Sequence, residues 1–384
     1  MAIEAKRART ESTPPPSATS AAAAASVFDS DDLLREILLR LGFTTCLLRA
    51  SFVCKRWLRH ASDPAFLRCF RERHPPTLLG FYLKEFLPLR PHFVPVSEAP
   101  ELAVVVRRAT LLEGSFVIRN CRNGHLLVKN LGAMATADQH AVLSPLHPER
   151  GMAVLPPPPR PSFRWFLLPQ NGGEDGVLAL EVRHIGRKIR AEVLSLQSGV
   201  WASRMKATVE PPITISIIGD VLPPVDGKMY METSLGYILR LDLAAASFSF
   251  IKLPDRVKTV NFKISCGDES GVFLIHAEDF MLSVWQHKKD DTGALDWVLM
   301  DDAILVHEAY NRMEAVLVVG VDENAEFVLL GLEKSGVLIC LNLRSRIERV
   351  HNQRFRNLGL VSIFPFMMTW PPIFPAVREE NPEE

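Results

Sequence analysis

Apolar residues recur with helical spacing between residues 30 and 42. Leu34, Leu38 and Leu41 are spaced i, i+4 and i+7, and Leu33 and Ile37 widen the same stripe. This pattern predicts an amphipathic helix. We expect Ser30 or Asp29 to cap the start of this helix. Asp31 and Asp32 would form its acidic first turn, and Gly42 would be the left-handed residue at its end.

Two further helices are predicted before residue 75. Cys46, Ala50, Val53 and Trp57 lie at i, i+4, i+7 and i+11, which predicts one continuous second helix. A third, short helix begins at Asp63-Pro64, carries Phe66, Leu67 and Phe70, and ends at His74-Pro75-Pro76. A module this small buries too little area to be secure alone, so it either borrows apolar surface from a partner or packs as a cap on the rest of the chain.

Short β-type runs separated by turn residues replace the helical pattern after Pro76. A polar turn followed by an apolar strand recurs every 44 to 54 residues at Asn123-Gly124, Asp175-Gly176, Asp226-Gly227, Ser270-Gly271 and Asn324-Ala325. A second marker at the end of each unit recurs every 47 to 50 residues at Val154, Trp201, Phe248, Trp297 and Ile347. Two markers with one period predict an all-β domain of repeated four-stranded sheets.

A β-propeller is the architecture that this period favours, because each sheet buries its faces against its neighbours. The markers give five full blades. The segments at the two ends, Leu78 to Leu83 and Leu358 to Thr369, are predicted to pair and close a ring of six blades, which hides the edge strands. A β-sandwich with coincidental spacing is the alternative.

The helical module resembles the F-box of plant F-box proteins. The resemblance rests on three stretches: residues 31–41 (DDLLREILLRL), 48–57 (LRASFVCKRW) and 62–67 (SDPAFL). In that family the module docks on a Skp adaptor, which tethers it to a cullin. The resemblance implies that the following residues form the shared core and the Skp-docking surface, without saying which does which: Leu33, Leu34, Ile37, Leu38, Leu48, Val53 and Trp57.

One departure from the F-box pattern bears on docking. The family usually begins with Leu-Pro, and the chain has Asp29-Ser30 there. Ser30 replaces Pro as a helix start, but the apolar contact of Leu is lost unless Val27 or Phe28 supplies it. Loss of one such side chain costs about 1.5 to 3 kcal/mol, which weakens docking roughly tenfold or more without abolishing it.

The β region resembles the kelch-like F-box-associated domains of the same family. Its closest matches are residues 120–127 (NCRNGHLL) and 225–230 (VDGKMY), the latter leading to 239–243 (LRLDL). Kelch repeats usually carry paired glycines before the second strand, and here Gly172-Gly173 alone matches that feature. We therefore predict a disordered tail (1–26), an F-box (27–74), a propeller-like domain (78–377) and a second disordered tail (378–384).

The amino-acid composition limits the kinds of partner and the cellular compartment that we expect. Lys plus Arg equals Asp plus Glu, 44 against 44, so no overall attraction to nucleic acid or to a membrane surface is expected. Six scattered cysteines without a C-x-x-C pair, and no apolar signal segment after Met1, are typical of a reducing compartment. We expect a soluble protein of the cytoplasm, the nucleus or both; the basic residues Lys6, Arg7 and Arg9 are either a nuclear address or a solvated end.

Motif searches predict no catalytic residue, cofactor or metal. The sequence lacks phosphate-binding glycine loops, a G-x-S-x-G elbow and an H-E-x-x-H motif, and His307-Glu308 has no second histidine at the required spacing. Acidic pairs at Asp290-Asp291 and Asp301-Asp302 fit turns. Arg183, Arg187, Lys188 and Arg190 flank a turn at Gly186, and they either grip an acidic peptide or form a solvated hairpin.

The sequence therefore predicts a non-enzymatic adaptor. Its F-box would bind Skp, and through it a cullin, while the propeller loops would bind an unidentified protein substrate for ubiquitination. Two alternatives remain open: an interaction scaffold that does not engage Skp, and a propeller lectin or enzyme with acids or aromatics converging at its central channel.

Overall fold

The computed structural model divides the chain into two compact units. One comprises Met1–Pro76 with Pro371–Glu384, and the other is Thr77–Trp370. The structure describes residues 30–75, 77–84, 91–96, 99–112, 116–130, 139–167, 176–211, 217–234, 236–257, 261–267, 271–289, 295–322, 325–354 and 362–374. The predicted disordered tails at 1–26 and 378–384 lie outside the described residues.

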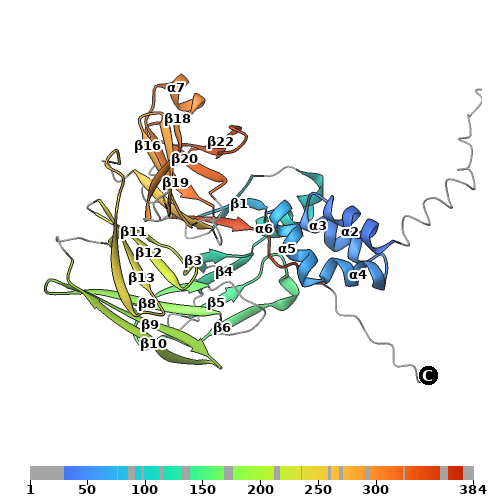
Figure 1. Cartoon of the computed structure of the whole chain (residues 1–384), viewed down its shortest axis with the longest axis horizontal. Helices are drawn as coiled ribbons and strands as arrows, with labels where there is room; N and C mark the ends of the chain where they lie inside the picture. The colour runs from blue at the N-terminus through green and yellow to red at the C-terminus, as the bar shows by residue number, and fades with distance from the viewer. Residues whose placement is uncertain are drawn as a thin grey trace, which may run out of the picture. The chain divides into compact units, whose positions relative to one another are not determined.

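The first unit contains four described helices (Figure 1). They are α2 (Asp31–Leu39), α3 (Thr44–Ser51), α4 (Lys55–Ser62) and α5 (Pro64–Arg73). Two predicted helix starts are confirmed. The Ser30 hydroxyl accepts a hydrogen bond from the Leu33 amide at 3.4 Å, and the Asp63 carboxylate accepts one from the Phe66 amide at 2.7 Å, with Pro64 in the first turn.

Two predictions about these helices are wrong. The expected continuous helix from Cys46 to Trp57 is broken after Ser51, and Cys54 is fully extended (φ −164°, ψ 168°) before α4 begins. Apolar residues at i, i+4, i+7 and i+11 cannot distinguish one helix from two short ones. Gly42 is not left-handed, because α2 ends earlier: the amides of Arg40 and Leu41 bond to carbonyls three residues back, which satisfies the last turn without a left-handed residue.

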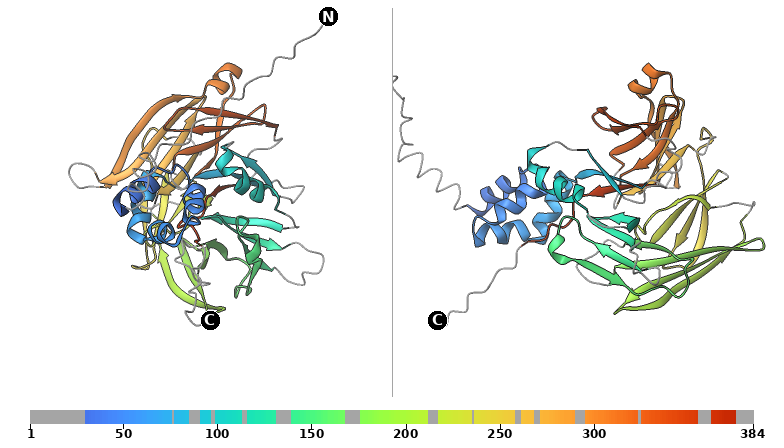
Figure 2. Two further views of the ribbon diagram at one scale, coloured as in Figure 1. Left: turned by 90° about the vertical axis from the view of Figure 1, so that its right-hand side faces the viewer. Right: turned by 180° about the vertical axis from the view of Figure 1, so that it is seen from behind.

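The second unit is a six-bladed β-propeller, as predicted, and the β-sandwich alternative is wrong (Figure 2). Each blade is an antiparallel sheet. Blade 1 is β3 (Phe116–Arg122), β4 (His125–Asn130), β5 (His140–Leu143) and β6 (Met152–Leu155); blade 2 is β7 (Arg164–Leu167), β8 (Val177–Ile185), β9 (Lys188–Gln197) and β10 (Val200–Val209). Blade 3 is β11 (Ile217–Val221), β12 (Lys228–Thr233), β13 (Tyr237–Asp242) and β14 (Ser247–Lys252).

The remaining blades follow the same order. Blade 4 is β15 (Phe262–Gly267), β16 (Gly271–Glu278), β17 (Met281–Lys289) and β18 (Leu295–Leu305); blade 5 is β19 (Val316–Val321), β20 (Phe327–Leu332), β21 (Val337–Asn342) and β22 (Glu348–Arg354). Blade 6 has three described strands in the order β2 (His92–Pro95), β1 (Leu78–Lys84) and β23 (Ser362–Met367). The predicted pairing of the two ends is thus confirmed, since β1 pairs with β23 from Leu78 opposite Met367 to Lys84 opposite Ser362.

Both sequence markers map onto equivalent places in the blades. Two of the recurring turns, Asn123-Gly124 and Asp226-Gly227, are described in full and lie between the first and second strands of their blades. Both have two successive residues with positive φ (49° and 74°; 48° and 71°). That is the conformation of a tight hairpin turn whose twist matches the strands. The second marker, from Val154 to Trp297, falls in the fourth strand of each blade, and Ile347 directly precedes β22.

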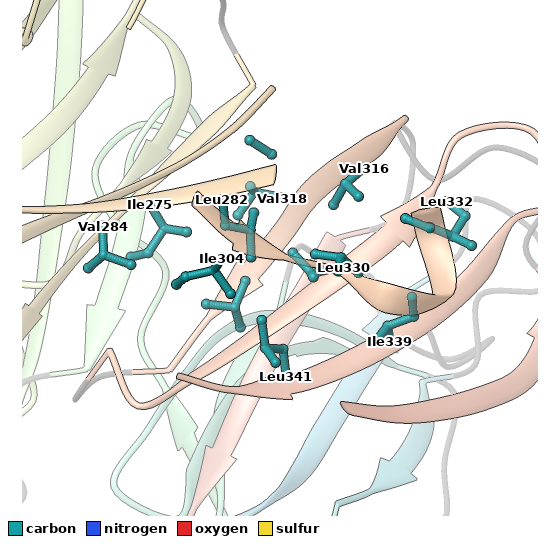
Figure 3. Close-up of a cluster of buried hydrophobic side chains, with 14 of the residues drawn as sticks. Ile275, Leu282, Val284, Ile304, Val316, Val318, Leu330, Leu332, Ile339 and Leu341 are labelled. Carbon is teal, nitrogen blue, oxygen red and sulfur yellow. The ribbon is translucent and has the colours of Figure 1, made fainter. Parts of the chain in front are cut away.

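Hydrophobic clusters fill the spaces between successive blades. Between blades 4 and 5, Ile275, Leu282 and Ile304 pack against Val316, Leu330 and Ile339 (Figure 3). Similar clusters join blade 1 to 2, 2 to 3, 3 to 4 and 5 to 6. Middle strands are buried on both faces, which explains why β20 and β21 are almost continuous apolar runs.

Two helices in the propeller unit correct the expectation that helical structure ends at Pro76. They are α6 (Ala103–Thr110) and α7 (His307–Arg312), accompanied by 3-10 turns at Pro100–Leu102 and Pro148–Arg150. The three valines of α6 resemble a strand in sequence. However, Val105 and Ala109 are spaced i, i+4 and are buried, and the Tyr82 hydroxyl of β1 donates a hydrogen bond to the Ala109 carbonyl at 2.8 Å.

Candidate docking surfaces

The seven residues predicted for the F-box core and docking surface separate into three groups by exposure. Leu34 and Leu38 are 0% exposed and belong to the interior of the helical unit. Leu33 and Val53 are 46% and 63% exposed. Ile37, Leu48 and Trp57 are half-buried. The structure therefore distinguishes interior from surface positions, which the sequence left open, while the docking role of these residues stays a prediction.

Two residues of this unit were not predicted from the sequence. Leu47 is 0% exposed, whereas its neighbour Leu48, which was predicted instead, is only half-buried. Phe52 is 70% exposed and lies at the break between α3 and α4, beside Val53. The signal for Phe52 is an aromatic residue at a helix break. This signal could be recognised only once the position of the break was known.

Charged and polar contacts join α2 to α4 and to the end of α5. The Asp31 carboxylate at the start of α2 lies 2.6 Å from the Arg56 guanidinium and 3.0 Å from the His60 ring nitrogen, both on α4. Hydrogen bonds from Arg56 and then His60 hold the pKa of Asp31 below its ordinary value. At the other end of α2, the Leu39 carbonyl lies 2.8 Å from the His74 ring nitrogen.

The His-Glu and Asp-Asp pairs that were considered as catalytic or metal-binding groups make structural contacts where they are described. The backbone amides of His307 and Glu308 donate to the Glu348 carboxylate at 2.7 and 3.2 Å, so this dipeptide begins α7. Asp301 pairs with Arg346, and Asp302 pairs with Arg256 at 3.0 Å. Asp290-Asp291 lies outside the described residues. Over the part of the chain that is described, no group of three or more His, Cys, Asp or Glu residues is placed to hold a metal ion.

Tryptophans pack against neighbouring strands. Trp165 stacks on His140 at 4.2 Å between ring centroids and meets Trp201 edge-on at 4.9 Å. The Trp201 and Trp297 indole nitrogens donate to the carbonyls of Pro156 and Lys252, at 3.0 and 2.7 Å. Indole rings held in this way contribute to blade packing.

A charged hollow lies on blade 2, near the Gly186 turn. Its volume is about 220 Å³, and its lining residues are Arg160, Glu181, Arg183, Ile185, Arg190, Glu192 and Lys206. Of the four basic residues predicted around the turn, Arg183 and Arg190 line the hollow. Arg187 pairs instead with Glu210 at 3.8 Å, and Lys188 lies opposite Ile185 in the hairpin.

A helical module followed by a six-bladed propeller is the arrangement of an F-box protein, and comparison with family models gives the same class. The F-box domain model matches residues 30–69. The model described as "F-box protein AT5G49610-like, beta-propeller" matches residues 117–374, and the chain belongs to that family. The family description names a propeller without assigning it to the kelch type. A search of the curated proteins found no match.

Solved structures with similar folds include three distant chains. A luciferin-regenerating enzyme is 12% identical (TM-score 0.34, covering 61% of this chain and 73% of that one). The Cps50 (Swd1) β-propeller domain of Myceliophteria thermophila is 10% identical (0.35, 59% and 68%), and a hypothetical selenium-binding protein from Sulfolobus tokodaii is 11% identical (0.37, 72% and 74%). TM-scores this low give no support for a shared function. Among the described helices, none is long and apolar enough to cross a membrane.

Proposed function

We propose that this chain is the substrate-recognition subunit of a Skp–cullin–F-box ubiquitin ligase. The observation that carries the proposal is the combination, in one chain, of an F-box match at residues 30–69 and a propeller of an F-box protein family. The F-box would bind the Skp adaptor and the propeller would bind the substrate. The chain itself would contribute orientation and effective concentration, and other subunits would transfer ubiquitin.

The docking surface that we propose for Skp contains the three large apolar side chains that are exposed among the described residues of the helical unit. These are Leu33 on α2 and Phe52 with Val53 at the break between α3 and α4. Apolar side chains left in water on so small a unit favour a partner that covers them. Burial of each contributes about 1.5 to 3 kcal/mol, so loss of one weakens binding roughly tenfold or more.

Leu34 and Leu38 have a different role in this proposal. Because both are fully buried, they shape the helical unit and do not touch the adaptor. A charge placed at either position would be buried without a partner and would unfold the unit, so loss of binding in such a variant says nothing about docking. Substitutions at exposed positions therefore test docking on the adaptor more directly.

Binding of a purified Skp adaptor to the full-length chain tests the proposal. The double variant Leu33→Asp, Val53→Asp should weaken the association by about a hundredfold, since two apolar contacts are lost and charge is placed in the interface. The matched control is Val200→Asp, because Val200 is an apolar residue of the propeller with similar exposure (68%) and lies far from the F-box in sequence. Circular dichroism checks that the helices remain folded in every variant.

The two possible results lead to different functions. Binding by the wild type and by Val200→Asp, with loss in the double variant, supports the ligase subunit. If the wild type shows no binding at micromolar adaptor concentrations, the ligase proposal fails and a scaffold that does not engage Skp takes its place.

A further inference from the structure

The face of blade 2 that carries the hollow changes from apolar to charged along its strands. On β8, Val177 and Ala179 are followed on the same face by Glu181 and Arg183, because residues two apart point to the same side. On the neighbouring strand β9, Leu196 and Leu194 are followed in the same way by Glu192 and Arg190. In the apolar half, Val177 and Leu196 pack against Leu127 and Leu155 of blade 1. Ala179 and Leu194 pack with Phe163.

The charged half lies beyond the part that blade 1 covers. Strands β8, β9 and β10 have 9, 10 and 10 residues, whereas β4, β5 and β6 of blade 1 have 6, 4 and 4 (Figure 1). The opposite face of the long strands is buried, since Ile189, Ala191 and Met205 pack against Met231 and Leu239 of blade 3. Blade 2 therefore presents a firmly supported charged surface.

Strand register places like charges opposite each other on this surface. Glu181 lies directly across from Glu192, and Arg183 directly across from Arg190. Such pairs destabilise a sheet unless opposite charges offset them. Arg160 does so for the two carboxylates, with guanidinium nitrogens 2.9 Å from Glu181 and 2.5 Å from Glu192.

Further hydrogen bonds and an ion pair surround the two carboxylates. Ser162 and Arg183 hydrogen-bond to Glu181, whose side chain is only 4% exposed, and the Lys206 ammonium lies 3.1 Å from Glu192. Burial by itself raises the pKa of Glu192, but hydrogen bonds from Lys206 and Arg160 outweigh it and lower that pKa. Both acids thus serve to fix the positions of the surrounding cations.

Arg190 is the cation that these acids do not neutralise. Among the residues that the structure describes, no carboxylate pairs with Arg190, and its cross-strand neighbour is the guanidinium of Arg183. The hollow contains four cations and two carboxylates, which leaves two positive charges in excess. Two guanidinium groups on adjacent strands are suited to bind one planar or tetrahedral oxyanion through several hydrogen bonds.

We propose that this hollow binds a phosphorylated side chain of a protein substrate, with Arg183 and Arg190 contacting the phosphate. A phosphomonoester carries about −1.5 to −2 charge at pH 7, which matches the excess in the hollow. Ile185 offers an apolar contact beside it. The anion would also relieve the repulsion between the two guanidinium groups. The consequence, ubiquitination of a phosphorylated substrate, rests on the proposed function, whereas the binding step does not.

A local site suits a single phosphoryl group better than a nucleic acid. Polyanions are bound by extended basic surfaces that neutralise many phosphates, whereas the chain has no net charge and the cations here are interleaved with carboxylates. A carboxylate side chain offers less charge than a phosphomonoester. We therefore expect aspartate or glutamate to bind at the same place more weakly.

Peptide libraries bound to the purified full-length protein test this inference. One library carries a fixed phosphoserine in degenerate flanks, and matched libraries carry serine or glutamate at that position; inorganic phosphate serves as a competitor. We expect at least tenfold greater retention of the phosphoserine library than of the serine library, with glutamate between them. Inorganic phosphate should displace the peptides only at millimolar concentration.

Variants distinguish the hollow from general basicity of the hairpin. Arg183→Ala with Arg190→Ala should reduce retention of the phosphoserine library at least tenfold. Arg187→Ala, which removes a neighbouring arginine whose side chain is 91% exposed and lies outside the hollow, should change it less than twofold. Equal retention of the phosphoserine and serine libraries, or equal losses in the two variants, overturns the inference. Because no Skp adaptor is present, failure here is separate from failure of the proposed ligase role.

Discussion

Asn123 and Trp370 exchange two hydrogen bonds across 247 positions of sequence. The Asn123 side-chain amide donates to the Trp370 carbonyl at 2.7 Å, and the Trp370 backbone amide donates to the Asn123 side-chain oxygen at 2.6 Å. Asn123 lies in the first hairpin turn of blade 1, whereas Trp370 follows β23 of blade 6. Together with the hydrogen bond from the Cys121 thiol to the Pro365 carbonyl, at 3.0 Å, this exchange joins the last blade to the first.

Replacement of Asn123 by glycine should weaken ring closure. Glycine adopts the positive φ of this turn without strain, so Asn123→Gly removes the two hydrogen bonds and leaves the turn intact. We expect a loss of about 1 to 3 kcal/mol in the free energy of unfolding, since two partly buried backbone groups lose their partner. Urea denaturation followed by tryptophan fluorescence measures it. The control is Asp226→Gly in the equivalent turn of blade 3, for which we expect a change within about 0.5 kcal/mol.

Gly124 is the neighbouring position at which even one methyl group should be costly. A Cβ there would overlap the Thr369 hydroxyl oxygen, and Gly124 has φ of +74°. Gly227 has nearly the same φ, +71°, but a Cβ added there would meet no atom within 4 Å. Gly227→Ala therefore reports the backbone strain alone, about 1 to 2 kcal/mol, and Gly124→Ala should exceed it by about 1 to 3 kcal/mol.

Removal of the clashing atom gives a second check on Gly124. Thr369 is buried, and within the described residues its hydroxyl oxygen has no hydrogen-bond partner. The double variant Gly124→Ala, Thr369→Ala should thus recover most of the excess loss. If it is no more stable than Gly124→Ala in thermal unfolding, the close approach to Thr369 is not the cause.

Much of the ring could be predicted from sequence because its markers are local. Turns such as Asn123-Gly124 depend on two residues that tolerate positive φ, and this preference is visible without knowledge of the fold. The break before Cys54 and the helix at Ala103 could not be predicted in this way, because packing decided them. Val105 is a strand former in isolation, yet its burial with Ala109 favours a helix.

The candidate sites were less predictable for a related reason. Leu33 and Leu34 are adjacent apolar residues with the same helical preference, and only the packing of other helices makes one exposed and the other buried. In blade 2, Arg183 and Arg190 are near each other in sequence and were recognised as a basic cluster. Strand register places Lys206 beside them, and Arg160, which lies before β7, reaches them with its long side chain. Sequence spacing alone reveals neither.

Leu38 and Leu33 should respond differently to truncation. Leu38→Ala leaves a cavity in the interior of the helical unit and should cost about 2 to 5 kcal/mol of that unit's stability. Leu33→Ala removes an exposed side chain and should cost no more than about 0.5 kcal/mol. Far-ultraviolet circular dichroism at the helical minimum follows the unit during denaturation of the full chain. Equal losses for the two variants would show that Leu33 is also an interior residue.

Asp31 should make the helical unit sensitive to acid. Since Arg56 and His60 depress the pKa of this carboxyl in the folded chain, its ionised form stabilises the fold above the ordinary value of 3.8, and that stabilisation is lost as the pH falls through the folded-state pKa. Asp31→Asn should therefore lower the unfolding temperature of the helices at pH 7. The difference from the wild type should shrink as the pH falls below 3.8. It should also shrink in high salt, because the pair is exposed to solvent.

Asp32→Asn provides the matched control for this effect. Asp32 also lies in the first turn of α2, so it shares any interaction with the helix dipole, but no basic side chain in the described residues pairs with it. A smaller change in Asp32→Asn than in Asp31→Asn at pH 7 assigns the effect to Arg56 and His60. If both variants lose the same stability, or if the Asp31→Asn difference does not shrink as the pH is lowered, the ion pair between α2 and α4 does not stabilise the unit.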